Sequence, residues 1–396
     1  MTPEELAEHY SRFRVTERVL LTGHSHQAWP DVAFDGQRDA IDDAAEFVDD
    51  KWTRAEAKAE RVRDGFRALL GDPRGEIALG GATHDLVVRF LSALDLKARP
   101  RLVTTDGEFH TLRRQLARLG EAGLDVVRVP AAPVDTLAGR LAAAADDRTA
   151  AVLVSAVLFE TARIVPGLDA LATACARRGS ELLVDVYHLV GPRRVSLPAL
   201  GLSEAWVLGG GYKYLQHGEG NCWLRLPPQA ADLRPVITGW YAEFDALAAA
   251  HRPGDPVPYG GLPARFAGST YDPTSHYRAA RVLRFFADRG LTPEVLEASY
   301  RHQVAVLAEA VDALDLPPAV LTRDRAVPAD GVAGFLALES PVAGELRAAL
   351  GRRDVASDSR GRSLRLGPAP YLSDAQLGEA VARLGSVAAE FVPSLQ

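Results

Sequence analysis

Between about residues 55 and 226 the sequence alternates segments of helical periodicity with short segments that are apolar at nearly every position. A strand that is covered on both faces needs apolar side chains on both, so the short segments predict a sheet between two layers of helices. Strands that alternate with helices pair mostly in parallel, and the predicted fold class is therefore α/β. The predicted strands are 101–104, 125–129, 150–155, 181–185, 205–208 and 222–226, and the predicted helices are 54–70, 83–94, 111–119, 137–145 and 168–178.

A second group of elements follows residue 273. The pattern predicts helices at 276–290, at 293–314 and at 373–384, where Ser373 is the cap, and strands at 332–338 and 364–366. The region 230–273 is rich in Pro, Gly and aromatic residues and predicts irregular structure. With 396 residues the chain exceeds the roughly 250–300 residues that one core supports. The predicted division is an N-terminal segment 1–50 that packs with the small domain, a large domain 51–265 and a small α+β domain 266–396.

Composition excludes several classes of function. The net charge is -7, and no block of positive charge suggests nucleic-acid binding. The acidic start lacks the apolar core of a signal peptide, and no apolar stretch reaches the ~20 residues that span a bilayer, which predicts a cytoplasmic protein without membrane contact. The two cysteines, Cys175 and Cys222, are too few for a disulfide framework or a zinc site. No metal site is therefore predicted.

Two motifs indicate chemistry. The first, Gly209-Gly210-Gly211-Tyr212-Lys213-Tyr214, follows a predicted strand and presents an amine between two phenols. The second ends the strand 181–185 and carries Asp185 and His188. A lysine that binds an aldehyde and a carboxylate that keeps a ring nitrogen protonated are what pyridoxal phosphate requires. Taken singly, each residue has a simpler interpretation. A lysine after glycines is also typical of a solvated loop, and an aspartate at a strand end is also typical of a helix cap or a turn.

These motifs resemble those of the kynureninases, which belong to the fold type I pyridoxal phosphate enzymes together with cysteine desulfurases and class V aminotransferases. The resemblance runs nearly end to end and begins at Leu21-Thr22-Gly23-His24-Ser25, similar to the family's Leu-x-Gly-Asn-Ser segment with His24 in place of asparagine. It implies a large domain with a mostly parallel seven-stranded sheet between helices, and a smaller α+β domain.

The resemblance also implies cofactor-binding residues before the lysine motif. Ala82 and Thr83 match the turn that holds the cofactor phosphate, and the free amides and dipole of a helix start favour an anion there. Phe109 matches the aromatic residue that stacks on the pyridine ring. Ser155 lies in the segment that runs beside the ring.

Further matches complete the implied site. Asp185 and His188 match the family's Asp-x-x-His, in which the carboxylate contacts the ring nitrogen and the imidazole lies beside it. The family's Schiff-base motif is matched by Tyr212-Lys213-Tyr214-Leu215, with Tyr212 as a candidate acid or base. Trp240, Ser269 and Thr270 match residues that the family uses at the subunit interface, which implies a homodimer with shared sites.

The implied substrate is an α-amino acid. Arg365 matches the arginine that binds the substrate carboxylate through a two-pronged charged hydrogen bond. In kynureninases the reaction is hydrolytic cleavage of the Cβ–Cγ bond with release of alanine. Leu158 and Thr270 stand where that family has histidine or asparagine, which predicts a changed pocket.

Other activities remain open at this stage. A β-lyase or an aminotransferase would use the same early chemistry, and a non-enzymatic relative would keep the fold alone. A desulfurase with a protein thiol as sulfur acceptor is disfavoured, because neither Cys175 nor Cys222 lies in a predicted loop.

Overall fold

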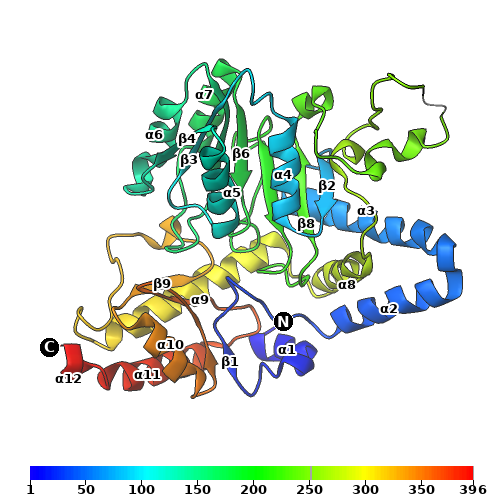
Figure 1. The fold of residues 1–396 in the computed structure, drawn as a ribbon. Coiled ribbons are helices and arrows are strands. Elements are labelled where there is room, and N and C mark those ends of the chain that lie inside the picture. The colour runs from blue at the N-terminus through cyan, green and yellow to red at the C-terminus, as the bar shows by residue number, and fades with distance from the viewer. Residues whose placement is uncertain (250–251, 396) are drawn as a thin grey trace.

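A seven-stranded sheet carries much of the chain between residues 76 and 226 in the computed structural model, which describes residues 1–249 and 252–395 (Figure 1). Only β8 runs against the other strands, so the sheet is mostly parallel, as predicted. In spatial order the strands are β2 (Glu76–Gly80), β8 (Cys222–Leu226), β7 (Trp206–Gly210), β6 (Glu181–Asp185), β5 (Thr149–Ser155), β3 (Arg101–Thr105) and β4 (Asp125–Val129).

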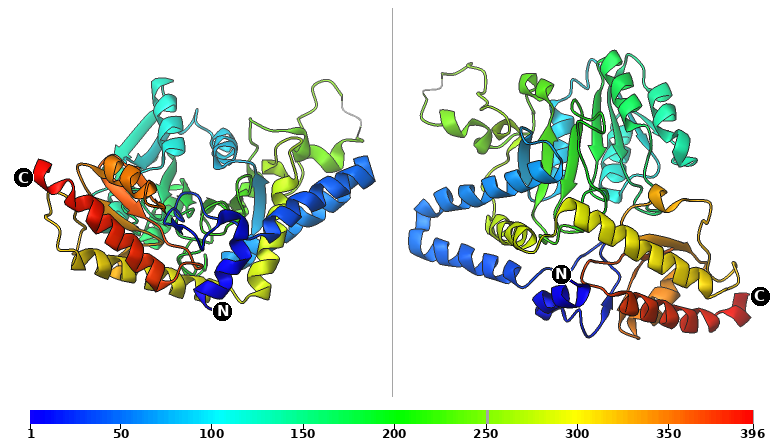
Figure 2. Two further views of the ribbon diagram at one scale, coloured as in Figure 1. Left: turned by 90° about the horizontal axis from the view of Figure 1, so that it is seen from below. Right: turned by 180° about the vertical axis from the view of Figure 1, so that it is seen from behind.

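Helices cover both faces of this sheet (Figures 1 and 2). On one face, Leu153 packs in a cluster with residues of α4 (Thr83–Ala93) and α5 (His110–Glu121). On the other face, the neighbouring Val152 packs with residues of α3 (Lys51–Leu69), α6 (Leu137–Ala144) and α7 (Leu168–Arg178). Successive strand residues face opposite sides, which is why the strands are apolar at nearly every position.

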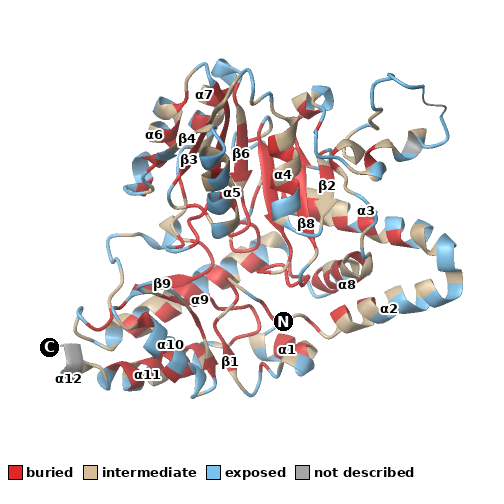
Figure 3. Cartoon of the chain, viewed as in Figure 1, coloured by how far each residue is buried: buried red, intermediate tan, exposed pale blue. Residues whose placement is uncertain are grey.

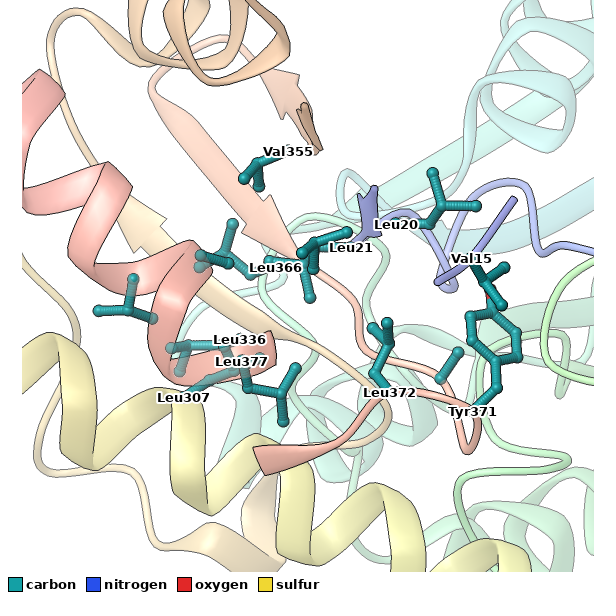
Figure 4. Packing of buried hydrophobic residues seen from close by; sticks show 14 of the residues in the cluster. Val15, Leu20, Leu21, Leu307, Leu336, Val355, Leu366, Tyr371, Leu372 and Leu377 are labelled. Carbon is teal, nitrogen blue, oxygen red and sulfur yellow. The ribbon is translucent and has the colours of Figure 1, made fainter. Parts of the chain in front are cut away.

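A smaller three-stranded antiparallel sheet lies below the large one in Figure 1. Its order is β11 (Asp358–Arg360), β12 (Ser363–Leu366) and β9 (Leu336–Glu339), and it packs with α9 (Pro293–Ala313), α10 (Ala343–Gly351) and α11 (Asp374–Ala389). Figure 4 shows Leu307, Leu336, Leu366 and Leu377 meeting in this core.

The N-terminal segment joins the same core. β1 (Val19–Leu20) pairs in parallel with β10 (Val355–Ala356), and Thr22 forms a bridge with Gly367. Val15, Leu20 and Leu21 lie beside C-terminal residues in Figure 4. The first turn of the chain is α1 (Pro3–Ala7) and the last helix is α12 (Val392–Leu395).

A pair of helices lies at the side of the molecule. α2 (Val32–Phe47) runs along α8 (Thr274–Asp288), and only Ala33 and Gly36 of α2 are buried (Figures 1 and 3). A side chain on Gly36 would approach the backbone of Arg278 within 2.8 Å, so the helices meet closely there. The sequence analysis did not predict α2, because so few of its side chains carry an apolar pattern.

Several predicted bounds agree with the structure. Strands 125–129, 181–185 and 222–226 and helix 168–178 begin and end where predicted. The predicted strand 332–338 is wrong at its start, because β9 begins only at Leu336 and Gly334 has a φ of 75°. Of the region 230–273, residues 250–251 lie outside the described part, and the rest contains the short 3-10 turns 228–232, 240–246 and 264–266. Within residues 1–249 and 252–395, no helix has the length and apolar character needed to cross a membrane.

Candidate active site

The predicted site residues meet at the carboxyl edge of the large sheet. Ser155 ends β5, Asp185 ends β6, and the register places these two residues side by side. Glu108 and Phe109 follow β3, which is the next strand on the other side of β5. Carboxyl ends of parallel strands share one edge, and open α/β sheets bind their ligands there.

A small cavity of about 30 Å³ lies at this edge. It brings together residues from β5, β6, the starts of two helices and the loop after β7. The residues that line it are Thr83, Phe109, Ser155, Val157, Phe159, Asp185, Tyr187, His188, Tyr212 and Lys213.

Lys213 is the buried amine of this cavity, with 5% of its surface exposed. Its Nζ lies 2.7 Å from Nε2 of His188, 5.3 Å from the ring centre of Phe109 and 4.7 Å from that of Tyr187. Burial lowers the pKa of Lys213 to about 7, and the charge of Asp185 opposes this shift. The amine is therefore substantially neutral, and nucleophilic, near neutral pH.

His188 connects Lys213 to a tyrosine. Burial, followed by the charge of Lys213, holds the pKa of His188 well below its usual value, so the imidazole is neutral. Its Nδ1 lies 3.3 Å from the hydroxyl of Tyr214. A neutral ring with its proton on Nδ1 accepts from Lys213 through Nε2 and donates to Tyr214.

Among the described residues, one carboxylate oxygen of Asp185 accepts a hydrogen bond and the other accepts none. Its Oδ1 accepts from the backbone N–H of Tyr187 at 2.8 Å. Burial raises the pKa of Asp185, which the Tyr187 N–H and the charge of Lys213 partly oppose. A half-buried carboxylate with a free oxygen favours a charged N–H donor, such as the protonated nitrogen of a pyridine ring.

Glu108 is a site residue that the sequence analysis missed. It is 1% exposed, and its two oxygens accept from the backbone N–H of Ser155 at 2.9 Å and from the Ser155 hydroxyl at 2.6 Å. Burial raises the pKa of Glu108 to about 8. These bonds tie the loop that carries Phe109 to the end of β5. The only sequence signal is an acidic residue directly before the predicted aromatic one.

The start of α4 has the features of an anion site. Ala82 occupies the N-cap position of this 11-residue helix and offers no side-chain acceptor to its first amides, whereas the backbone N–H of Thr83 donates to the thiol of Cys222. Ala82 and Gly81 are exposed, and a side-chain carbon on Gly81 would meet nothing within 4 Å. Amides at a helix start with open space before them suit a phosphate group.

Trp240, Ser269 and Thr270 lie outside this cavity, on the surface of the same chain. The indole Nε1 of Trp240 donates to Oγ1 of Thr270 at 3.3 Å, and all three residues are exposed. The sequence resemblance assigns these residues to a neighbouring subunit's site, and their exposure leaves them accessible to a second chain.

Arg365 lies on β12 with 3% of its surface exposed. Its Nη1 donates to the carbonyl oxygen of Phe159 at 2.6 Å, and its Nη2 donates to Asp358 on the neighbouring strand. Phe159 also lines the cavity of Lys213. Arg365 therefore lies behind the wall of the cavity, and it already has a carboxylate partner.

Comparison with known proteins places this arrangement in context. No protein-family model matches the sequence. Over 244 residues the chain is 24% identical to the uncharacterized aminotransferase YcbU of Bacillus subtilis (strain 168), a match that covers 61% of this chain and 62% of that protein.

Solved structures match over nearly the whole chain. A variant of C-DES with glycine covalently linked to its pyridoxal phosphate has a TM-score of 0.81 at 16% identity, covering 96% of this chain and 98% of that one. The fold is that of C-DES and the cysteine desulfurases. The cysteine desulfurase of Thermococcus onnurineus NA1 has a TM-score of 0.79 at 16% identity and covers 98% of this chain and 99% of its own. CsdA of Escherichia coli has a TM-score of 0.78 at 15% identity, with both chains fully covered.

These likenesses confirm the predicted fold. None of the proteins named above is a kynureninase, so that part of the resemblance stays a prediction. The predicted domain boundaries and site roles also stay predictions.

Proposed function

We propose that this protein is a pyridoxal phosphate enzyme that acts on an α-amino acid. The observation that carries the proposal is one cavity in which a buried amine, Lys213, a half-buried carboxylate, Asp185, and an aromatic ring, Phe109, come together. The fold supports it, since C-DES has the same fold and binds pyridoxal phosphate.

The residues present suit the cofactor. Lys213 would bind the aldehyde of the cofactor, and Asp185 would accept from its ring nitrogen. Phe109 would stack on one face of the ring, and the amides of Ala82 and Thr83 would bind the phosphate. When bound, the protonated ring supplies an electron sink for the bond that breaks in the substrate.

The remaining roles belong to side chains. Lys213 would also act as the base for the proton on the α-carbon of the substrate, because a pKa of about 7 leaves its amine substantially neutral at neutral pH. Burial raises the pKa of Tyr212 to about 12, so Tyr212 keeps its proton and serves as an acid. Arg365 binds the substrate carboxylate and so fixes which bond faces the ring.

The leading reaction is hydrolytic Cβ–Cγ cleavage of kynurenine or a related γ-keto amino acid, which rests on the sequence resemblance. A β-lyase that breaks a C–S bond is the second candidate. It is favoured by the shared fold with C-DES, described as a cystine C-S lyase with cysteine persulfide as its product. Cys175 and Cys222 are both buried, so neither is an exposed sulfur acceptor.

We also propose a homodimer in which Trp240 and Thr270 reach the phosphate site of the partner. Both residues are exposed, and neither lines the cavity of its own chain, which supports this assignment.

Cofactor attachment tests the main proposal. We expect the purified protein, incubated with pyridoxal phosphate, to show a visible absorption band that is stable to dialysis. Lys213→Ala should lose the band, and borohydride reduction should fix the cofactor on Lys213 in mass spectra. A colourless wild-type protein at saturating cofactor would refute the proposal.

Product analysis separates the reactions. The enzyme would be mixed with kynurenine, 3-hydroxykynurenine, cysteine and cystine. Alanine with an aromatic acid supports Cβ–Cγ hydrolysis, pyruvate with ammonia supports the β-lyase, and a keto acid that retains the side chain supports an aminotransferase.

A further inference from the structure

The guanidinium of Arg365 is held by a carboxylate of its own chain. Asp358 lies directly opposite Arg365 in the pairing of β11 with β12, and the ion pair joins Nη2 to Oδ2. Nη1 is anchored separately by the Phe159 carbonyl, whereas Nε is buried without a partner among the described residues. The guanidinium therefore has a fixed position and one carboxylate already bound.

Asp358 has a second cation within reach. Its Oδ1 accepts from Nη1 of Arg360 at 2.9 Å, and the Arg360 side chain is 43% exposed. Arg360 also lines a cavity of about 1050 Å³ that lies between residues of α9, β9 and the loop 131–135. Asp358 thus bridges a buried arginine and an exposed one, and it keeps a cation if it leaves Arg365.

His24 does not supply a third charge. Its Nε2 lies 3.6 Å from Oδ2 of Asp358, beyond hydrogen-bonding distance. Burial lowers the pKa of His24 to about 4, so the ring is neutral at physiological pH. Among residues 1–249 and 252–395, the cations that pair with Asp358 are therefore Arg365 and Arg360.

This ion pair lies close to Lys213. The ring of Phe335 lies 5.8 Å from the guanidinium of Arg365 and 5.8 Å from the ring of His188, which contacts Lys213. After burial and Asp185, the charges of Arg365 and Asp358 shift the pKa of Lys213 in opposite directions. The pair is therefore near enough to act on a ligand that reaches Lys213.

We propose that Asp358 is a specificity-determining residue that competes with the substrate carboxylate for Arg365 and moves onto Arg360 when the substrate binds. This inference rests on the proposed function, since it assumes that Arg365 receives the substrate carboxylate. The exchange replaces one carboxylate by another, so the carboxylate group alone contributes little net binding free energy. Affinity then depends on the rest of the substrate, including its contacts with Phe159, an aromatic residue that lines the cavity and whose carbonyl oxygen accepts from Arg365. The site selects α-amino acids with a substantial apolar or aromatic side chain over small ones.

Glycine is the probe that isolates the carboxylate. It has the α-amine and the carboxylate but no side chain, and its binding to the cofactor-loaded enzyme is followed by the change in the visible spectrum. Asp358→Asn keeps the shape of the side chain and removes its charge. We expect Asp358→Asn to lower the apparent dissociation constant of glycine about tenfold, because an unpaired buried guanidinium favours an incoming carboxylate.

Arg360→Gln tests the second half of the exchange. Without Arg360, the displaced Asp358 loses its cation, so we expect the apparent dissociation constant of glycine to rise about threefold or more. The double variant should bind glycine as tightly as Asp358→Asn alone. Arg362→Gln is the matched control, because Arg362 lies on the same turn but pairs with Glu339 at 3.2 Å, and it should leave glycine binding unchanged.

Thermal unfolding supplies a readout that does not depend on turnover. In the absence of glycine, Asp358→Asn should unfold at a lower temperature than the wild type. Saturating glycine should raise the unfolding temperature of Asp358→Asn by more than it raises that of the wild type. Unchanged or weaker glycine binding in Asp358→Asn would overturn the inference and leave Asp358 as a residue that only positions Arg365. If that variant does not fold, the Arg360→Gln arm decides alone, and unchanged glycine binding there overturns the inference. Failure of the proposed function looks different, because the wild-type protein would then lack the cofactor band.

Discussion

At the scale of single residues, burial of Lys213 decides its protonation. The unfolded chain keeps a proton on this amine up to about pH 10.5, whereas in the folded chain the pKa is about 7. The desolvation that lowers the pKa acts on the charged form alone. The neutral fraction therefore rises with pH through about 7, and attack on an aldehyde needs the neutral amine.

We predict that cofactor uptake by cofactor-free protein reports this pKa. The initial rate of appearance of the absorption band should rise between pH 6 and 8 and become flat above about pH 8.5. The side-chain amine of Nα-acetyl-lysine is the control, because its reaction rate with pyridoxal phosphate should keep rising toward pH 10. An uptake rate that still rises through pH 10 in the protein would contradict the assigned pKa.

The candidate site could be predicted from sequence only in part. Lys213 and Asp185 stand in short motifs next to strand ends, so local pattern was sufficient to propose them, whereas Phe109 and Ser155 were proposed from the family resemblance. Glu108 and Asp358 were not predicted, because their roles depend on partners brought near by the fold. Glu108 binds a residue 47 positions away, and Asp358 meets Arg365 only through a strand register that the sequence does not display.

At the scale of elements, the glycines that end β7 let the lysine motif fit against its neighbours. A side-chain carbon on Gly210 would lie 2.2 Å from the hydroxyl of Tyr187, and one on Gly209 would lie 2.5 Å from the ring of Trp223. Contacts this short are not tolerated. The close approach explains why glycine stands at these positions of the strand.

We predict that Gly210→Ala displaces Tyr187 and with it the environment of Lys213. The cofactor band should weaken, and stability should fall by about 1–3 kcal/mol as in other overpacked cores. Gly378→Ala is the control, because Gly378 lies in α11 with open space around it, and alanine should stabilise that helix by about 0.5–1 kcal/mol. Denaturant unfolding and cofactor titration of both variants measure the contrast. Normal cofactor binding by Gly210→Ala would refute this account.

The elements of the large sheet were predictable because each buried strand is a short apolar run next to glycine or polar residues. α2 was not, since its contact with α8 uses Gly36 and Ala33 in place of large apolar side chains. The start of β9 was misplaced because apolar residues before it, such as Phe335, pack against the rings of His24 and His188 and do not pair in the sheet.

At the scale of the whole molecule, one segment carries a concentration of exposed apolar side chains. Val236, Ile237, Trp240, Phe244 and Val257 are each at least 40% exposed. A contiguous segment of this kind is typical of a surface that another chain covers. It also carries Trp240, which the proposed function assigns to the partner's site.

We predict that the protein sediments at twice its chain mass of 42.5 kDa and that Phe244→Asp dissociates it, because a charge in an apolar interface is costly to bury. Val295→Asp is the control: Val295 is 47% exposed on α9, far along the chain from this segment. Analytical ultracentrifugation of the three proteins is the measurement. A wild-type monomer, or a Phe244→Asp dimer as stable as wild type, would contradict the predicted interface.

The pairing of β1 with β10 joins Val19 to Val355, and this has a consequence for biosynthesis. On the ribosome, the first strand emerges hundreds of residues before its partner exists. Residues 15–21 must therefore wait, without their partners, until residues 355 and 356 have been made. The large sheet, whose strands all lie between residues 76 and 226, has no such delay. Folding during synthesis should thus proceed from the middle of the chain outward, and the lobe formed by both ends should close last.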